Sequence, residues 1–251
     1  MNHSIEVSEE AGVRSLHFGS SWIQGSMRVA RPFSLELEYT REMMAALLLR
    51  PDEAWPRKVL LVGLGAGSLT KFLWRNRPQA HLTVVEINPE VVGTAYANFR
   101  LPDDPSRIRI EIADGVHFVE CAETRFDLIL VDGFDSKGRA GSLDTGDFYT
   151  ACRKRLTKEG LMVVNLLGRS RGFKASAERI RLAFEGRSLV FPSCDAGNAI
   201  AFAAVGEPLE LPLSDLKESA QTLKKATGLN LLPTLTRLEQ AATCKDGALR
   251  L

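Results

Sequence analysis

The sequence has little that would direct it to a membrane or to a nucleic acid. None of its apolar runs approaches the roughly 20 residues of a membrane span. The N-terminus has no basic segment followed by an apolar one, so we expect no signal peptide and a cytoplasmic protein. A net charge of +1 supplies no general attraction to nucleic acid or to a membrane surface. We therefore expect neither as a partner.

Cysteine and histidine are also sparse. The four cysteines lie far apart and form no Cys-x-x-Cys pair, which is typical of free thiols in a reducing compartment. The four histidines have no spacing that would place two metal ligands on one face. We expect no metal site.

Apolar residues make up 45% of the 251 residues and charged residues 25%, as in ordinary globular proteins. This length suits one large α/β domain with a small accessory piece. Strands alternate with helices after residue 56, which predicts a doubly wound, mainly parallel sheet. We place a small N-terminal β lobe and connecting helix at 1–50. The Rossmann-like domain with a C-terminal helical tail then occupies 51–251.

Hydrophobic periodicity places the individual elements. A hairpin with a turn at Gly12 is expected near the N-terminus, and a helix at 38–49. The central elements are strands at 59–62, 82–85, 108–112, 126–131 and 160–166, and helices at 88–99, 116–121, 147–156 and 173–184. Residues 136–146 read as a lid loop. An antiparallel pair at 189–191 and 199–205 precedes a helical tail at 213–242, broken at Gly228 and Pro233.

A glycine-rich turn follows the first buried strand. Gly63, Gly65 and Gly67 would let the backbone approach a ligand closely, and the helix after them offers unpaired N–H groups. Glu86 ends the next strand, where its carboxylate could accept both hydroxyls of a ribose. Ser68 stands where a dinucleotide fingerprint needs its third glycine, so a pocket of the S-adenosylmethionine type fits better than one for NAD.

Two further acids, Asp114 and Asp132, also stand at predicted strand ends. Because parallel strands end at one edge of a doubly wound sheet, these acids, the glycine turn and Glu86 should converge on one crevice.

These residues resemble the spermidine synthase (polyamine aminopropyltransferase) family, a branch of the class I S-adenosylmethionine-dependent fold. The resemblance runs from about residue 5 to 205 and is most specific at 59–166. By resemblance, the donor-binding residues are Gly63, Gly65, Ala66, Gly67, Glu86, Asp114, Gly115 and Asp132. The same resemblance gives Gln24, Tyr39 and Asp135 as residues that bind the acceptor. Arg41 and Phe134 depart from the family's pattern, and we expect them to bind the acceptor as well.

The resemblance implies transfer of an aminopropyl group to an amine from decarboxylated S-adenosylmethionine or from S-adenosylmethionine. Asp132 would take the proton of the amine, and Asp135 would help to hold a cationic group. The resemblance also implies a homodimer formed through the N-terminal lobe, which is shortened here.

The chain departs from the family at the amino-acid end of the donor. Ala66 stands where the family has an aspartate that repels the carboxylate of ordinary S-adenosylmethionine. Tyr39 stands one residue before the position at which the family has its tyrosine. We hypothesise that Arg41 pairs with a carboxylate of the donor or acceptor; the alternative places it in solvent on the outer face of its helix. Methyl transfer and a non-catalytic adenosyl-binding protein therefore remain open. An NAD-dependent oxidoreductase is disfavoured by Ser68.

Overall fold

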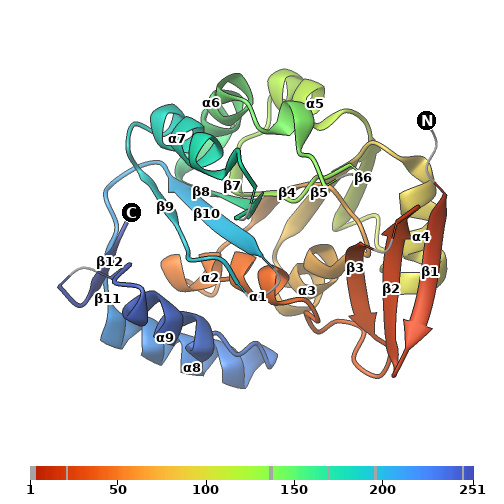
Figure 1. The fold of residues 1–251 in the computed structure, drawn as a ribbon, viewed down its shortest axis with the longest axis horizontal. Helices are drawn as coiled ribbons and strands as arrows, with labels where there is room; N and C mark the ends of the chain where they lie inside the picture. The colour runs from red at the N-terminus through yellow and green to blue at the C-terminus, as the bar shows by residue number, and fades with distance from the viewer. Residues whose placement is uncertain (1–3, 21, 136–137, 169, 195–196, 245) are drawn as a thin grey trace.

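The computed structural model describes residues 4–20, 22–135, 138–168, 170–194, 197–244 and 246–251. Its centre is a seven-stranded sheet (Figure 1). Five neighbouring strands are parallel, and each of the last two pairs antiparallel with the strand before it. In spatial order the strands are β6 (Ile108–Ile112), β5 (His81–Glu86), β4 (Lys58–Val62), β7 (Phe126–Val131), β8 (Leu156–Leu167), β10 (Asn198–Ala204) and β9 (Ser188–Val190). The predicted doubly wound, mainly parallel sheet is confirmed.

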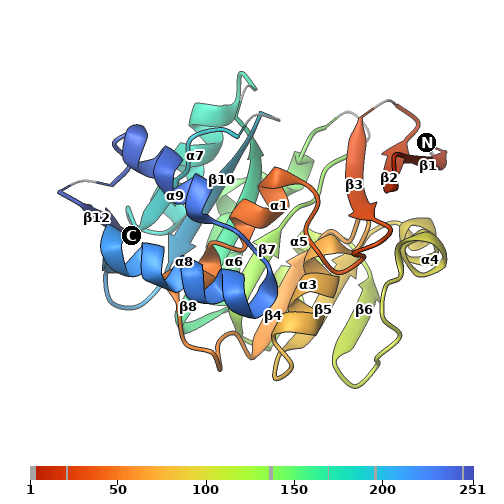
Figure 2. The same ribbon diagram turned by 90° about the horizontal axis from the view of Figure 1, so that it is seen from below.

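Helices cover both faces of this sheet because its strands are apolar on both sides. One face carries α5 (Gly115–Cys121), α6 (Gly146–Lys154) and α7 (Phe173–Ala183). The other carries α1 (Glu38–Met43), α2 (Ala46–Leu49), α3 (Ser68–Asn76) and the C-terminal helices α8 (Leu213–Thr227) and α9 (Leu232–Gln240), as Figure 2 shows from below. Helix α4 (Pro89–Phe99) lies beside β5, near the N-terminal strands.

The order of the strands creates a crevice at one place. The chain starts in the middle at β4, moves outward through β5 and β6, and then returns to β7 on the other side of β4. The loops that leave the carboxyl ends of β4 and β7 therefore diverge, and such a point is where open α/β sheets bind ligands.

The N-terminal strands form a separate antiparallel sheet of β1 (Ile5–Glu10), β2 (Val13–Phe18) and β3 (Ile23–Arg28), as predicted. This lobe touches the glycine turn: the Ser68 hydroxyl donates to the carbonyl of Ser26 at 3.2 Å. The division at residue 50 stays a prediction. Residues 43–49 belong to the same hydrophobic core as the central sheet.

Several expectations about the elements were wrong. The single helix predicted at 38–49 is two helices, because the N–H groups of Met44 and Ala45 bond three residues back, to Arg41 and Glu42 (3.1 and 2.8 Å). Pro233 does not break the tail; it lies in the first turn of α9, where its missing N–H is harmless. The pair β11 (Glu210–Pro212) and β12 (Ala248–Arg250) was not anticipated.

The predicted lid at 136–146 contains the short 3-10 helix η1 (Gly141–Leu143). Its first two positions, 136 and 137, lie outside the described residues. None of the helices in the described part of the chain is long and apolar enough to cross a bilayer.

Candidate active site

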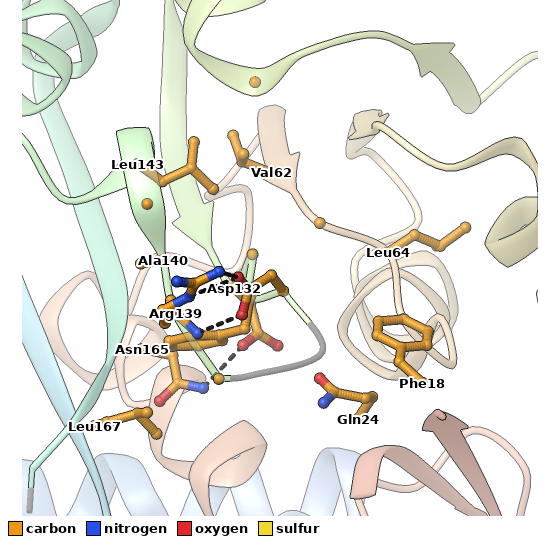
Figure 3. A pocket seen from close by; sticks show the side chains of 18 of the residues that line it. Phe18, Gln24, Val62, Leu64, Asp132, Arg139, Ala140, Leu143, Asn165 and Leu167 are labelled. Atoms are coloured by element: carbon orange, nitrogen blue, oxygen red, sulfur yellow. Dashed lines mark hydrogen bonds and ion pairs between the residues drawn. The ribbon is translucent and has the colours of Figure 1, made fainter. Parts of the chain in front are cut away.

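A cavity of about 840 Å³ opens at the carboxyl ends of β4, β5 and β7 (Figure 3). Its walls come from the glycine turn, the strand ends, β3, the start of α1 and the lid. Of the residues predicted from the sequence, Gln24, Tyr39, Gly63, Gly65, Glu86, Asp114, Gly115, Asp132, Phe134 and Asp135 line it. Segments distant in sequence thus meet in one crevice, as the strand order requires.

The glycine turn and Glu86 form one unit. Gly63 and Gly65 have φ angles of +98° and +53°, which side chains rarely adopt, and a Cβ on Gly63 would overlap the carbonyl of Asp132. The backbone N–H of Leu64 donates to Glu86 Oε2 at 3.0 Å, and that of Asn88 donates to Oε1 at 2.9 Å. The Glu86 carboxylate is therefore fixed at the edge of the cavity, with lone pairs left for ligand hydroxyls.

Asp114 caps helix α5. Its Oδ1 accepts the backbone N–H groups of Val116 and His117 at 2.9 and 3.0 Å. Gly115 follows in the cavity wall, where a Cβ would meet Val62 and Leu143. Val62 and Leu143 therefore pack closely on Gly115 and give this part of the cavity wall an apolar surface.

Asp132 follows β7 and is the centre of a chain of hydrogen bonds. The Tyr39 hydroxyl donates to its Oδ2 at 3.1 Å, and the Asn165 amide donates to its Oδ1 at 2.9 Å. The Asn198 amide in turn donates to Asn165 Oδ1 at 2.9 Å. The ends of β7, β8 and β10 and the start of α1 together orient this carboxylate.

Burial raises the pKa of Asp132, and the hydrogen bonds from Asn165 and Tyr39 act in the opposite direction. The side chain of Asp132 keeps some exposure to solvent through the cavity, but burial by the surrounding protein is the largest cause of the raised pKa. Burial, and after it the charge of Asp132, raise the pKa of Tyr39 well above its usual value. Tyr39 thus stays a hydrogen-bond donor, and Asp132 is a stronger base than an ordinary carboxylate.

Asp135 directly precedes the lid and is bound to Arg139 within it. The backbone N–H and Nε of Arg139 donate to the two carboxylate oxygens of Asp135, both at 2.9 Å, and Nη2 lies 2.8 Å from Oδ2. Phe134 lines the cavity next to this pair. Asp132 and Asp135 therefore differ: Asp132 is held by neutral donors and Asp135 by a cation.

The far end of the lid is tied to the helices behind it. Asp144 accepts the Tyr149 hydroxyl at 2.8 Å, the Ser176 hydroxyl at 2.7 Å and the Arg179 guanidinium at 2.5 Å. These bonds hold the neighbouring Leu143 in the cavity wall.

Three residues predicted for the site do not line the cavity. Ala66 is buried against Gly25 of β3, and Gly67 lies beneath Leu101. The Arg41 guanidinium donates to the carbonyls of Leu35 and Glu36 at 3.2 and 2.6 Å. One nitrogen of this half-buried guanidinium thus bonds the turn before α1, and the pairing of Arg41 with a carboxylate of the donor or acceptor stays a prediction.

Other residues of the site were missed, among them Asn165, Asn198 and Arg139. Asn165 had a readable signal, because it interrupts an otherwise apolar run at 161–167. Within the described residues, no three side chains of His, Cys, Asp or Glu cluster as a metal site would require.

Comparison with known proteins places the chain among transferases. The sequence model of the spermine/spermidine synthase domain matches residues 37–166. The polyamine aminopropyltransferase of Chromobacterium violaceum is 36% identical over 94% of this chain and 89% of its own length. That of Neisseria meningitidis serogroup A is 34% identical over the same shares of the two chains.

Solved structures have the same fold. A probable spermidine synthase from Corynebacterium glutamicum superposes with a TM-score of 0.72 at 20% identity, over 90% of this chain and 91% of that one. A spermidine synthase in complex with the transition-state analogue AdoDATO gives a TM-score of 0.63 at 23% identity, over 90% and 80%. Human methyltransferase-like protein 13 with SAH gives 0.67 at 25% identity, over 76% and 93%.

Proposed function

The chain belongs to the spermine/spermidine synthase family, and we propose on this basis that it transfers an aminopropyl group to the nitrogen of an amine. The observation that carries the proposal is Asp132, a partly buried carboxylate of raised pKa beside the glycine turn, oriented by Tyr39 and Asn165. A base in that position is what an amine nucleophile needs, since amines are protonated at neutral pH and must lose a proton to attack.

The reaction is a single displacement in which electrons and protons balance. The amine nitrogen forms a bond to the aminopropyl carbon next to sulfur, and the carbon–sulfur bond breaks with its electron pair left on sulfur. The sulfonium becomes a neutral thioether, 5′-methylthioadenosine, and the proton of the nitrogen passes to Asp132. The chain itself contributes orientation and a preformed electrostatic environment.

We propose that Glu86 and Asp114 bind the adenosyl end of the donor. The cradle fits such a group, because the backbone of Gly63 and Gly65 lines the cavity beside Glu86, whose carboxylate is already fixed by two backbone N–H groups. A sulfonium donor makes carbon attached to sulfur electrophilic.

Decarboxylated S-adenosylmethionine is the donor that we propose. Among the described residues, the half of the cavity around α1 and the lid has the carboxylates of Glu38, Asp132 and Asp135 and one arginine, Arg139. Arg139 and Arg237 pair with Asp135 and Glu38, so among the described residues the negative charge that no arginine offsets is that of Asp132, beside the reacting centre. That charge favours a donor that ends in an ammonium over one that also bears a carboxylate. Ala66 does not decide this choice, because it is buried outside the cavity.

The test is to incubate the protein with each of the two donors and a panel of primary amines, followed by mass spectrometry of the amine. We expect an aminopropyl adduct from the decarboxylated donor, reduced about 10²- to 10⁴-fold in Asp132→Asn, the range for loss of a general base. Asp127→Asn is the matched control, since Asp127 bonds the backbone N–H groups of Arg57 and Lys58 at the opposite end of β7. A methyl adduct from the ordinary donor, or no adduct from either, would refute the proposal.

A further inference from the structure

The acceptor half of the cavity, defined by the start of α1 and the loop after β7, is less acidic than its carboxylates suggest. Glu38, Asp132 and Asp135 line this half. Glu38 lies 3.1 Å from Arg237 of α9, whose guanidinium it shares with the buried Glu42. Asp135 is paired with Arg139 at 2.8 Å. Among the described residues, Asp132 alone of the three has neutral hydrogen-bond donors instead of a cation.

Asp135 and Arg139 are joined by a backbone hydrogen bond as well as by an ion pair. The N–H of Asp135 donates to the carbonyl of Arg139 at 3.0 Å, and the N–H of Gly138 donates to the carbonyl of Asp135 at 2.9 Å. Together with the bonds from Arg139 to the carboxylate, they link Asp135 to Gly138 and Arg139. In an exposed ion pair, another cation could easily replace Arg139 as the partner of Asp135. Here that replacement would also break the hydrogen bond from the backbone N–H of Arg139 to the Asp135 carboxylate.

The rest of this half suits an uncharged group. Leu37 and Leu167 line the cavity next to α1 and at the end of β8, and Trp22 and Ile23, with 55% and 52% of their surface exposed, also line it. Gln24 adds an amide that can bond a hydroxyl. Figure 3 shows Arg139, Asp132 and Asn165 on one side of the pocket and Gln24 and Phe18 on the other.

We propose that the acceptor is an amine with a single positive charge, whose far end is uncharged, and that Arg139 sets this specificity. This inference rests on the proposed function. Asp132 receives the reacting amine. A second ammonium at the far end of the acceptor meets carboxylates that already pair with arginines, and it is repelled by the Arg139 guanidinium.

Three acceptors of equal chain length test the proposal: 4-amino-1-butanol, 1,4-diaminobutane and 4-aminobutanoate. We expect kcat/KM for the amino alcohol to exceed that for the diamine by about fivefold or more, the scale of repulsion between two nearby like charges in water. Calorimetry of each amine with the protein saturated in 5′-methylthioadenosine should give the same order of affinities. Added salt should narrow the ratio, because Arg139 is exposed.

Variants then assign the effect to Arg139. Arg139→Gln should lower the ratio of amino alcohol to diamine towards one or below it, and Arg139→Lys, which keeps the charge, should leave the ratio above that of Arg139→Gln. Arg181→Gln is the matched control: it removes an arginine that pairs with Glu178 on the outside of α7 and should leave the ratio unchanged.

The outcomes separate this inference from the proposed function. Transfer to no amine refutes the function. Transfer with the diamine preferred, or a ratio that Arg139→Gln leaves unchanged, refutes the specificity and leaves the function intact. Preference for 4-aminobutanoate would also overturn the inference, since Arg139 would then be binding an anion in place of Asp135.

Discussion

The hydrogen bonds to Asp132 set how strong a base it is, and removing one of them should change the pH dependence of the reaction in a defined direction. Tyr39→Phe removes the hydroxyl that donates to Asp132 Oδ2 at 3.1 Å and leaves the ring in place. The donor favours the ionised carboxylate, so its loss raises the pKa of Asp132 further. A hydrogen bond to a charged group contributes about 1.5–3 kcal/mol, which corresponds to roughly one to two pKa units.

The reaction needs Asp132 ionised, so its rate rises with pH through the raised pKa. We expect the acid limb of the kcat/KM profile to move to higher pH by about one unit or more in Tyr39→Phe. Asn165→Leu, which removes the amide at Oδ1, should move it in the same direction. The acceptor amine titrates in the same way in every variant, so the ratio of variant to wild type at each pH isolates Asp132.

Tyr149→Phe is the matched control, because it removes a tyrosine hydroxyl that donates to a different aspartate, Asp144, at 2.8 Å. It should leave the acid limb in place. An unchanged limb in both Tyr39→Phe and Asn165→Leu, or a shift to lower pH, would show that Asp132 is not the base.

Three further changes test the supports of the site. Arg237→Ala leaves the buried carboxylate of Glu42 unpaired and should cost up to about 3–5 kcal/mol at neutral pH by urea unfolding. Burial raises the pKa of Glu42 in the folded protein, so this loss should shrink as the pH falls and the carboxylate becomes protonated; a loss independent of pH would contradict it. Glu86→Gln places an amide against two backbone donors and should weaken 5′-methylthioadenosine about ten- to a hundredfold by calorimetry, whereas unchanged affinity would remove Glu86 from the site. Gly63→Ala should lose well over 1 kcal/mol in thermal unfolding, and Gly12→Ala, with a φ of +73° but open space around it, should lose less; equal losses would refute the steric argument.

The parts of the fold that depend on local pattern could be predicted from the sequence. The apolar run of β4, the glycines after it and the helical spacing of α3 define a strand, turn and helix without any knowledge of their neighbours. Strand ends of a parallel sheet share one edge, so Glu86, Asp114 and Asp132 could be brought together in the same way.

The parts that depend on tertiary contacts could not. Tyr39 comes one residue earlier than in the family, yet it reaches Asp132, because the direction of its side chain is set by how α1 packs on the sheet. The sequence suggests Arg41 as a ligand residue, but one nitrogen of its guanidinium bonds nearby carbonyls. The role of Arg139 depends on the fold of the lid, for which its sequence carries no periodic pattern.

The nucleoside product of a single turnover tests the central claim most directly. The protein is mixed in excess with decarboxylated S-adenosylmethionine and 4-amino-1-butanol, and the quenched mixture is separated by liquid chromatography. The account predicts that 5′-methylthioadenosine and the aminopropylated amine form in equal amounts, and that both disappear together in Asp132→Asn. S-adenosylhomocysteine formed in a parallel reaction with ordinary S-adenosylmethionine, with no 5′-methylthioadenosine from the decarboxylated donor, would contradict it.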